Sequence, residues 1–292
     1  MSRILVVSLL ALLATVTGNT QVPKLNSYPS ANATIFLDFD GQTVTSSDWT
    51  MYTGGAPFYA TPPALLNSQQ LTTIFNQVAE DFRPFNLNIT TDSTVYFATP
   101  LNRRVRIIIT DSSAWYGNTA GGVAWVGTFK TGTETPAFVF SKLHNYSTKR
   151  IAETISHETG HTLGLYHQSR YDAACGFMGE YHSGQGDPAT ETSWSPIMGN
   201  NLARNLTLWH NGPNNFGCNN LQDDLSIISA MGTGTNGFGY RPDDVGNTTT
   251  AAATVNFSGQ TYGVNGFINS TGDVDYFRVN LSERGRFKAN AI

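Results

Sequence analysis

The stretch His157-Glu158-Thr159-Gly160-His161-Thr162-Leu163-Gly164-Leu165-Tyr166-His167 carries three histidines and one acid at fixed intervals. The first two histidines are four residues apart, and on a helix this spacing places two side chains on the same face. A glycine such as Gly164 can end a helix in a left-handed conformation at little cost, which would swing His167 back toward the other two. The stretch therefore predicts a helix with three imidazoles gathered near its end.

Three converging imidazoles predict a zinc site at His157, His161 and His167. Three protein ligands leave the fourth position of a tetrahedral zinc open, which is typical of a catalytic site. Glu158 follows the first ligand directly and would point beside the ion, so we predict that it acts as the catalytic general base. The alternative is that the histidines merely cap or solvate a helix. The sequence thus favours one catalytic Zn²⁺, and a structural Ca²⁺ cannot be assigned to particular residues.

The remaining histidines, His144, His182 and His210, show no comparable spacing, so we expect surface or loop positions for them.

Apolar patterning around this stretch predicts a sheet with helices. β-Branched and aromatic runs indicate strands, and apolar residues at i, i+3, i+4 and i+7 indicate a helical face. The predicted strands are Thr34–Phe39, Val105–Ile109, Gly121–Phe129 at an edge, and Ala137–Phe140, and the predicted helices are Ser68–Phe82 and Lys149–Leu163. Helical periodicity returns around Leu221, Leu225, Ile227 and Ile228.

Downstream, Trp194-Ser195-Pro196-Ile197-Met198-Gly199-Asn200 places a methionine in a turn about thirty residues after the histidines. With this order of motifs the chain resembles the metzincins, and within them the reprolysin-like secreted metallopeptidases. The matching stretches fall in order between about 34 and 240: Val78–Phe85, Gly121–Ala124, the histidine motif, Ser193–Gly199 and Asp223–Ile228.

The resemblance implies an α+β, zincin-like fold with a twisted mixed sheet and an active-site helix. It implies that Met198 packs beneath the zinc, and that an extended peptide pairs with an edge strand, here Gly122, Val123, Ala124 and Trp125. An ordinary edge strand without substrate is the alternative. Some metzincins carry a tyrosine two residues after the turn methionine, but this chain has Asn200 there, so no such tyrosine can be assigned.

The two ends of the chain predict a leader and a second domain. Arg3 followed by the apolar run 4–14 is typical of a signal peptide, here 1–18, because the run is too short for a membrane anchor. The catalytic domain would span 19–242, with linker composition in Arg241–Ala253. Residues 243–292 resemble the first part of a bacterial pre-peptidase C-terminal β-sandwich, chiefly in Asp273-Val274-Asp275-Tyr276-Phe277.

The cysteines and sequons agree with secretion into an extracellular space. Cys175 and Cys218, the only cysteines, could close a disulfide in an oxidising compartment, although two free thiols remain the alternative. Several Asn-X-Ser/Thr sequons could accept glycans; they begin at Asn32, Asn88, Asn145, Asn205, Asn247, Asn256, Asn269 and Asn280.

The composition narrows the classes of molecule that this protein is expected to bind. The net charge is only −4 and there is no basic block, which argues against nucleic acid and, once the leader is removed, against membranes. We therefore expect a monomeric, secreted zinc metalloendopeptidase that acts on proteins or peptides. The rival interpretations are a catalytically inactive binding module that retains zinc, and a zinc hydrolase acting on a non-peptide amide or ester.

Overall fold

The computed structural model describes residues 21–117, 119–255, 263–280 and 288. The expected leader, 1–18, lies outside these residues. Within the described part, none of the helices is both long and apolar enough to cross a membrane.

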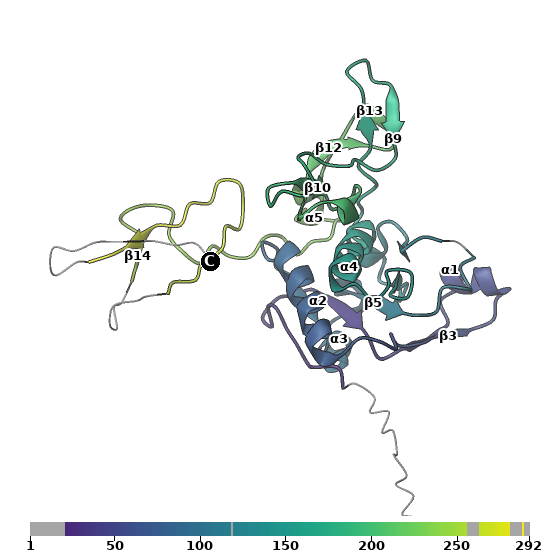
Figure 1. Cartoon of the computed structure of the whole chain (residues 1–292). Coiled ribbons are helices and arrows are strands. Elements are labelled where there is room, and N and C mark those ends of the chain that lie inside the picture. The colour runs from purple at the N-terminus through teal and green to yellow at the C-terminus, as the bar shows by residue number, and fades with distance from the viewer. Residues whose placement is uncertain (1–20, 118, 256–262, 281–287, 289–292) are drawn as a thin grey trace, which may run out of the picture.

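A five-stranded sheet lies at the centre of the larger body (Figure 1). Its spatial order is β4-β1-β5-β7-β6, with the first four strands parallel and β6 antiparallel to β7 at the edge. The strands are β1 (Thr34–Asp38), β4 (Asn88–Thr90), β5 (Arg104–Thr110), β6 (Gly122–Val123) and β7 (Ala137–Phe140). The mixed sheet and the predicted strands β1, β5 and β7 are thereby confirmed to within a residue or two.

Two long helices, α2 (Ser68–Asp81) and α4 (Thr148–Thr162), cover one face of this sheet. Side chains alternate across a strand, so Ile107 and Ile109 of β5 join the core under these helices while Ile108 faces the other way. The start of α2 is set by a capping box between Asn67 and Gln70. Both predicted helices are confirmed, and α4 carries the histidine motif.

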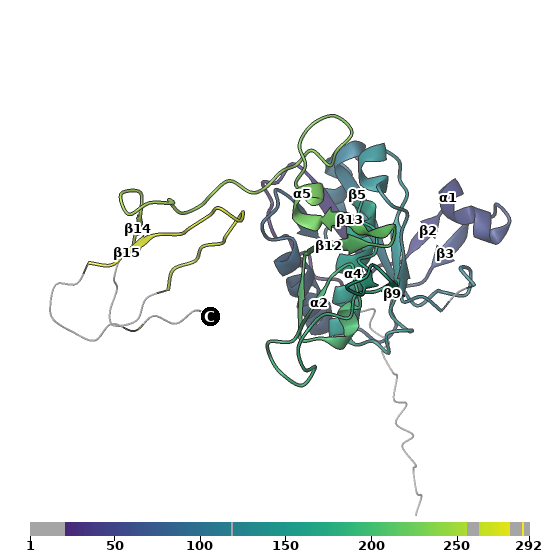
Figure 2. The same ribbon diagram turned by 90° about the horizontal axis from the view of Figure 1, so that it is seen from above.

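The opposite face is covered by a small layer made of β2 (Gln42–Val44), α1 (Ser47–Thr50) and β3 (Phe58–Ala60), which lie together beside the sheet (Figure 2). Trp49 is fully buried there, donates its indole N–H to the carbonyl of Pro136 at 2.7 Å, and meets Phe138 edge-on at 5.3 Å. This layer therefore packs against β7, the strand next to β6.

The predicted edge strand Gly121–Phe129 is wrong beyond Val123. Gly127 adopts a left-handed conformation with φ 76° and donates its N–H to the carbonyl of His161, so the chain turns away. Phe129 is then buried within a 3₁₀ helix, η3 (Thr128–Thr131), against Phe238 at 5.5 Å. The chain therefore buries the Phe129 side chain instead of continuing to pair with β7.

After α4 the chain forms short strand pairs. They are β8 (Arg170–Tyr171) with β9 (Phe177–Gly179), β10 (Trp194–Pro196) with β11 (Leu206–Leu208), and β12 (Asn211–Asn214) with β13 (Gly217–Asp223). The remaining helices are α3 (Ser93–Ala98), α5 (Asp224–Ile228), η1 (Met51–Thr53), η2 (Leu101–Arg103) and η4 (Asn201–Ala203). The predicted helical segment is wrong at Leu221, which lies in β13, because the Asp223 side chain caps Ser226 N–H and starts α5 only after it.

The C-terminal segment extends away from this body (Figures 1 and 2). Its described residues form one parallel pair of two-residue strands, β14 (Ala253–Thr254) and β15 (Phe277–Arg278). The β-sandwich expected for 243–292 therefore remains a prediction.

Candidate active site

The three histidines of the motif meet at the end of α4. Their ring centroids lie 4.8 Å apart for His157 and His161, 5.2 Å for His157 and His167, and 4.8 Å for His161 and His167. One nitrogen of each ring lies within 4.8 Å of the other two, which is close enough for all three to hold a single metal ion.

The other nitrogen of each ring faces an acceptor that cannot donate a proton. His157 Nδ1 lies 2.7 Å from the carbonyl of Ile197, and His161 Nδ1 lies 2.8 Å from that of Leu165. His167 Nδ1 lies 2.7 Å from a carboxylate oxygen of Glu180. Each Nδ1 must therefore carry a proton, and in the neutral ring the lone pair is then on Nε2.

This tautomer fits a metal site. The Nε2 atoms of His161 and His167 are 3.1 Å apart, so two lone pairs would face each other with no proton between them. Two nitrogens bound to one tetrahedral zinc at about 2.0–2.1 Å lie roughly 3.3 Å apart. Burial together with repulsion from the neighbouring rings lowers the pKa of His157 strongly and that of His161 to about 4, so both rings stay neutral as ligands must be.

The turn that brings His167 to this point depends on Gly164, whose φ is 104°. Its N–H bonds to the carbonyl of His161, and the N–H of Leu165 bonds to that of Gly160. These are the two hydrogen bonds of a Schellman motif, which ends a helix on a left-handed residue. The same turn presents the Leu165 carbonyl to His161.

Met198 lies fully buried beneath the helix. A Cβ atom at Gly160 would come within 2.5 Å of its sulfur, so the glycine between the two motif histidines is what admits the thioether. The turn around Met198 also holds both arms of the site: Ile197 accepts from His157, and Met198 accepts from Gln168 N–H next to His167.

Glu158 sits beside the histidines and is only 6% exposed. Burial alone raises the pKa of its carboxyl to about 8, and a nearby cation would act in the opposite direction. A Cβ atom at Gly122 would lie 2.7 Å from the Glu158 side chain, so strand β6 runs directly against this carboxylate. The edge of the sheet and the Glu158 carboxylate therefore border the same space.

That space is a cleft of about 670 Å³ with the three histidines and Glu158 in its lining. Gly122, Val123 and Ala124 contribute to one wall, whereas Trp125, also predicted there, packs against Trp49 at 5.7 Å. Of the predicted substrate strand, only the first two residues form β6.

Three residues around the cleft were missed or misjudged from the sequence. Glu180 orients His167, and the Tyr181 ring lies tilted by 44° against the same ring at 4.4 Å, where burial raises the pKa of its phenol to about 12. His144 is buried rather than at the surface, and its Nε2 lies 3.1 Å from both the Gly121 carbonyl and the Thr154 hydroxyl. None of the three stands at a spacing that sequence patterns could reveal.

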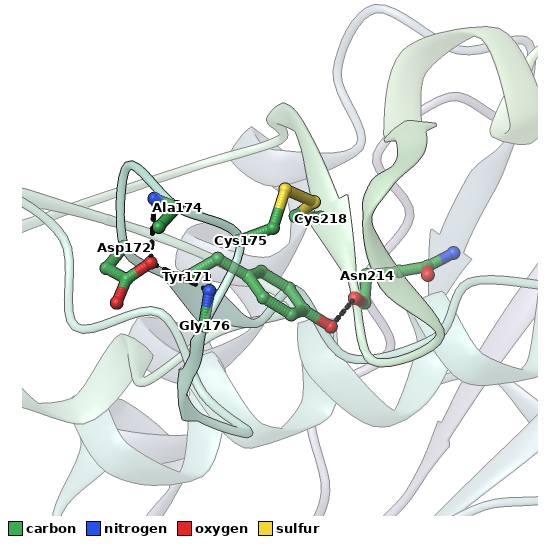
Figure 3. The surroundings of a disulfide bond; sticks show 7 residues. All are labelled: Tyr171, Asp172, Ala174, Cys175, Gly176, Asn214 and Cys218. Atoms are coloured by element: carbon green, nitrogen blue, oxygen red, sulfur yellow. Dashed lines mark hydrogen bonds between the residues drawn. A yellow bond between two sulfur atoms is a disulfide. The ribbon is translucent and has the colours of Figure 1, made fainter.

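A disulfide joins Cys175, between β8 and β9, to Cys218 in β13, with a Cα–Cα distance of 5.5 Å (Figure 3). Nearby, the Asp172 carboxylate accepts from the N–H groups of Ala174 and Gly176, and the Tyr171 hydroxyl donates to the Asn214 carbonyl. The bridge thus ties the β8–β9 pair to the β12–β13 pair.

Comparison with known proteins supports a metallopeptidase. Residues 68–210 match the family Reprolysin_5, described as metallo-peptidase family M12. The matched segment is just under half of the chain and contains α2, β6, the histidine motif, Glu180 and Met198. No curated protein matches the chain. The family match and the buried histidine triad together support a zinc metallopeptidase domain that acts on proteins or peptides.

Proposed function

We propose that this protein is a secreted, zinc-dependent endopeptidase of the metzincin type, with His157, His161 and His167 as zinc ligands and Glu158 as general base. The observation that carries the proposal is the convergence of three Nε2 lone pairs beside a buried carboxylate that is not among the ligands. Zinc bound there would polarise the scissile carbonyl and lower the pKa of water toward neutrality.

The chain's own residues supply the rest of the reaction. Glu158 would take a proton from the attacking water and pass it to the leaving amine, which requires a carboxylate close to the reacting atoms yet off the metal. Its burial suits the task because a proton held in a poorly solvated site is transferred without loss to bulk water.

Substrate positioning would come from β6. It is the last strand of the sheet, pairs with β7 on one side only, and lines the cleft on the other. An extended peptide could pair with its free edge by β-augmentation. Because Gly122 has no side chain, the backbone of a substrate peptide paired with β6 and the Glu158 carboxylate could approach each other closely.

Secretion rests on the leader-like residues 1–18 and on the disulfide between Cys175 and Cys218, which is typical of oxidising compartments.

The decisive test replaces Glu158 with Gln. We expect Glu158→Gln to bind zinc as the wild type does but to digest casein at least 10²-fold more slowly, because only the proton acceptor is removed. His161→Ala should lose the zinc itself, and Glu191→Gln, on an exposed loop, should retain both properties. Full casein digestion by Glu158→Gln, or digestion by the wild type after chelation of zinc, would refute the proposal.

A further inference from the structure

A second group of metal-ligating side chains lies in the C-terminal segment, away from the histidines. One carboxylate oxygen each from Asp243, Asp273 and Asp275 lies within 4.8 Å of the other two. Asp243 belongs to the segment that leaves the larger body, whereas Asp273 and Asp275 belong to the turn before β15. The cluster therefore joins two stretches that are thirty residues apart in sequence.

Two of these carboxylates have buried oxygens that find no hydrogen-bond partner among residues 21–117, 119–255, 263–280 and 288. Asp273 is 9% exposed; its Oδ2 accepts the N–H of Asn269 at 2.7 Å, but its Oδ1 is buried and unpartnered. The Oδ1 atom of Asp275 is likewise buried and unpartnered. A buried oxygen of this kind loses its hydration and gains nothing in return, which is costly unless another ligand satisfies it.

The charges in this cluster are uncompensated by ion pairs. The pKa of Asp275 is raised, first by desolvation and then by repulsion from Asp273, Asp244 and Asp243. Among the described residues, none of these aspartates makes a salt bridge. Arg241 is close in sequence, but its guanidinium lies over the rings of Tyr28 at 4.2 Å and Phe267 at 5.4 Å. Like charges are thus held together, and no positive side chain among the described residues pairs with them.

We propose that Asp243, Asp273 and Asp275 bind one Ca²⁺ ion. A donor set made only of carboxylate oxygens suits a hard cation rather than zinc. Three oxygens that all lie within 4.8 Å of one another can share one ion at about 2.4 Å, which is the calcium–oxygen distance. Calcium also tolerates an irregular shell completed by backbone oxygens and water.

The ion would hold the C-terminal segment together. Hydrogen bonds already link its two stretches: Ala253 N–H bonds to the Tyr276 carbonyl, Val255 N–H to that of Arg278, and Val274 N–H to the Asn247 side chain, and further bonds join Tyr276 to Gly246 and Arg278 to Thr249. The paired strands are only two residues long. A cation between Asp243 and the 273–275 turn would add a further link between the two stretches and so favour the ordered segment.

Calcium binding can be measured directly on the full-length, zinc-loaded protein by isothermal titration in calcium-depleted buffer. We expect one Ca²⁺ per chain with a dissociation constant of about 10⁻⁴–10⁻³ M, the range of extracellular calcium modules. The double variant Asp273→Asn/Asp275→Asn should bind at least tenfold more weakly, and Asp187→Asn, on an exposed loop, should bind like the wild type. Failure of the wild type to saturate below about 10 mM calcium, or unchanged binding by the double variant, would overturn the proposal.

Hydrogen exchange over residues 241–280 separates a cation site from a merely structural role of the aspartates. Calcium should slow exchange in the wild type and leave the double variant unaffected. Without calcium the double variant should exchange no faster than the wild type. The amide that replaces the Asp273 carboxylate keeps an oxygen that accepts the Asn269 N–H, and the loss of two negative charges relieves the repulsion among the aspartates. Faster exchange by the calcium-free double variant would mean that the carboxylates are needed as hydrogen-bond acceptors, and would contradict the proposal.

Discussion

The Nδ1–H group of each histidine in the site donates to a different part of the chain, and the three accepting groups differ in charge. His157 donates to a carbonyl in the Met198 turn, His161 donates to the end of its own helix, and His167 donates to the Glu180 carboxylate. A carboxylate partner raises the basicity of a ligating imidazole more than a neutral carbonyl does. Glu180 is thus a positioning residue whose effect should appear in metal affinity.

We expect Glu180→Gln to lower zinc affinity by about 10- to 100-fold, because the amide can still accept from Nδ1 but no longer carries the charge that strengthens the ligand. Competition with a chromophoric chelator measures this affinity. Glu191→Gln provides a control of the same chemistry on an exposed loop. Equal affinities in the two variants would show that the Glu180 contact has no influence on the metal.

The proximity of the motif side chains could be predicted from sequence because their relations are local. A four-residue helical spacing and a helix-ending glycine act over two turns, so His157, Glu158, His161 and Gly164 follow from stereochemistry alone. Glu180 is thirteen residues from the ring that it contacts. Its position depends on the β8–β9 turn, which no short pattern encodes.

Among the elements, the contact between α2 and α4 contains a buried acid. Asp81, the last residue of α2, accepts a 2.6 Å hydrogen bond from the hydroxyl of Ser156 in α4. Desolvation raises the pKa of its carboxyl to about 7, although the Ser156 hydrogen bond opposes this shift and Glu153 and Glu80 add to it. The folded state therefore favours the protonated form of the Asp81 carboxyl more than the unfolded chain does.

This preference predicts a pH dependence of stability. The unfolded carboxyl titrates near 3.8, so between about pH 4 and pH 7 the folded state binds a proton that the unfolded state lacks. The free energy of unfolding should then fall as pH rises through this window, by at most about 1.4 kcal/mol per pH unit. The stabilisation that comes from protonating Asp81 is complete below pH 3.8, the pKa of this carboxyl in the unfolded chain, and is lost above about pH 7.

The variant Asp81→Asn keeps an acceptor for Ser156 but cannot ionise. Its unfolding free energy relative to the wild type should therefore increase from pH 5 to pH 8, as measured by urea denaturation at each pH. Asp187→Asn serves as the exposed control, for which the difference should stay flat. If the difference for Asp81→Asn were also independent of pH, the carboxyl would have an ordinary pKa in the folded protein.

Element boundaries followed the sequence where apolar periodicity was long, as in α2 and α4, and failed where one distant contact decided the path. Phe129 leaves the expected edge strand because it is buried against Phe238, more than a hundred residues away. Leu221 pairs in β13 because Asp223 caps the following helix. Short segments carry too little periodic signal to outweigh such contacts.

For the molecule as a whole, the Cys175–Cys218 bridge stabilises the region between His167 and α5. The bridged residues are 43 apart in sequence, and closing such a loop in the unfolded chain is worth about 4 kcal/mol by chain entropy. The loop encloses Glu180 and Met198, both of which contact the metal-site region. Stability and metal retention should therefore be linked through this bridge.

We expect Cys175→Ser/Cys218→Ser to release zinc at a lower urea concentration than the wild type, with early proteolytic cuts between 170 and 222. The sheet, α2 and α4 lie outside the loop and should be cut later. Zinc release followed with a fluorescent chelator, together with mass spectrometry of the fragments, tests both points. Identical release midpoints for the oxidised wild type and the double variant would show that the bridge does not support the site.

The amino-acid sequence alone predicted that the three histidines and Glu158 lie together, the helix that carries His157, Glu158 and His161, and strands β1, β5 and β7, because each of these depends on spacing within a short stretch of chain. Only the folded chain showed which groups surround them: Glu180 and two carbonyls that set the histidine tautomers, Gly160 over Met198, and Gly122 against Glu158. Apart from the bond between His161 and Leu165, these contacts join segments that are not neighbours in sequence, and their partners are defined by packing in three dimensions rather than by any periodic pattern along the chain.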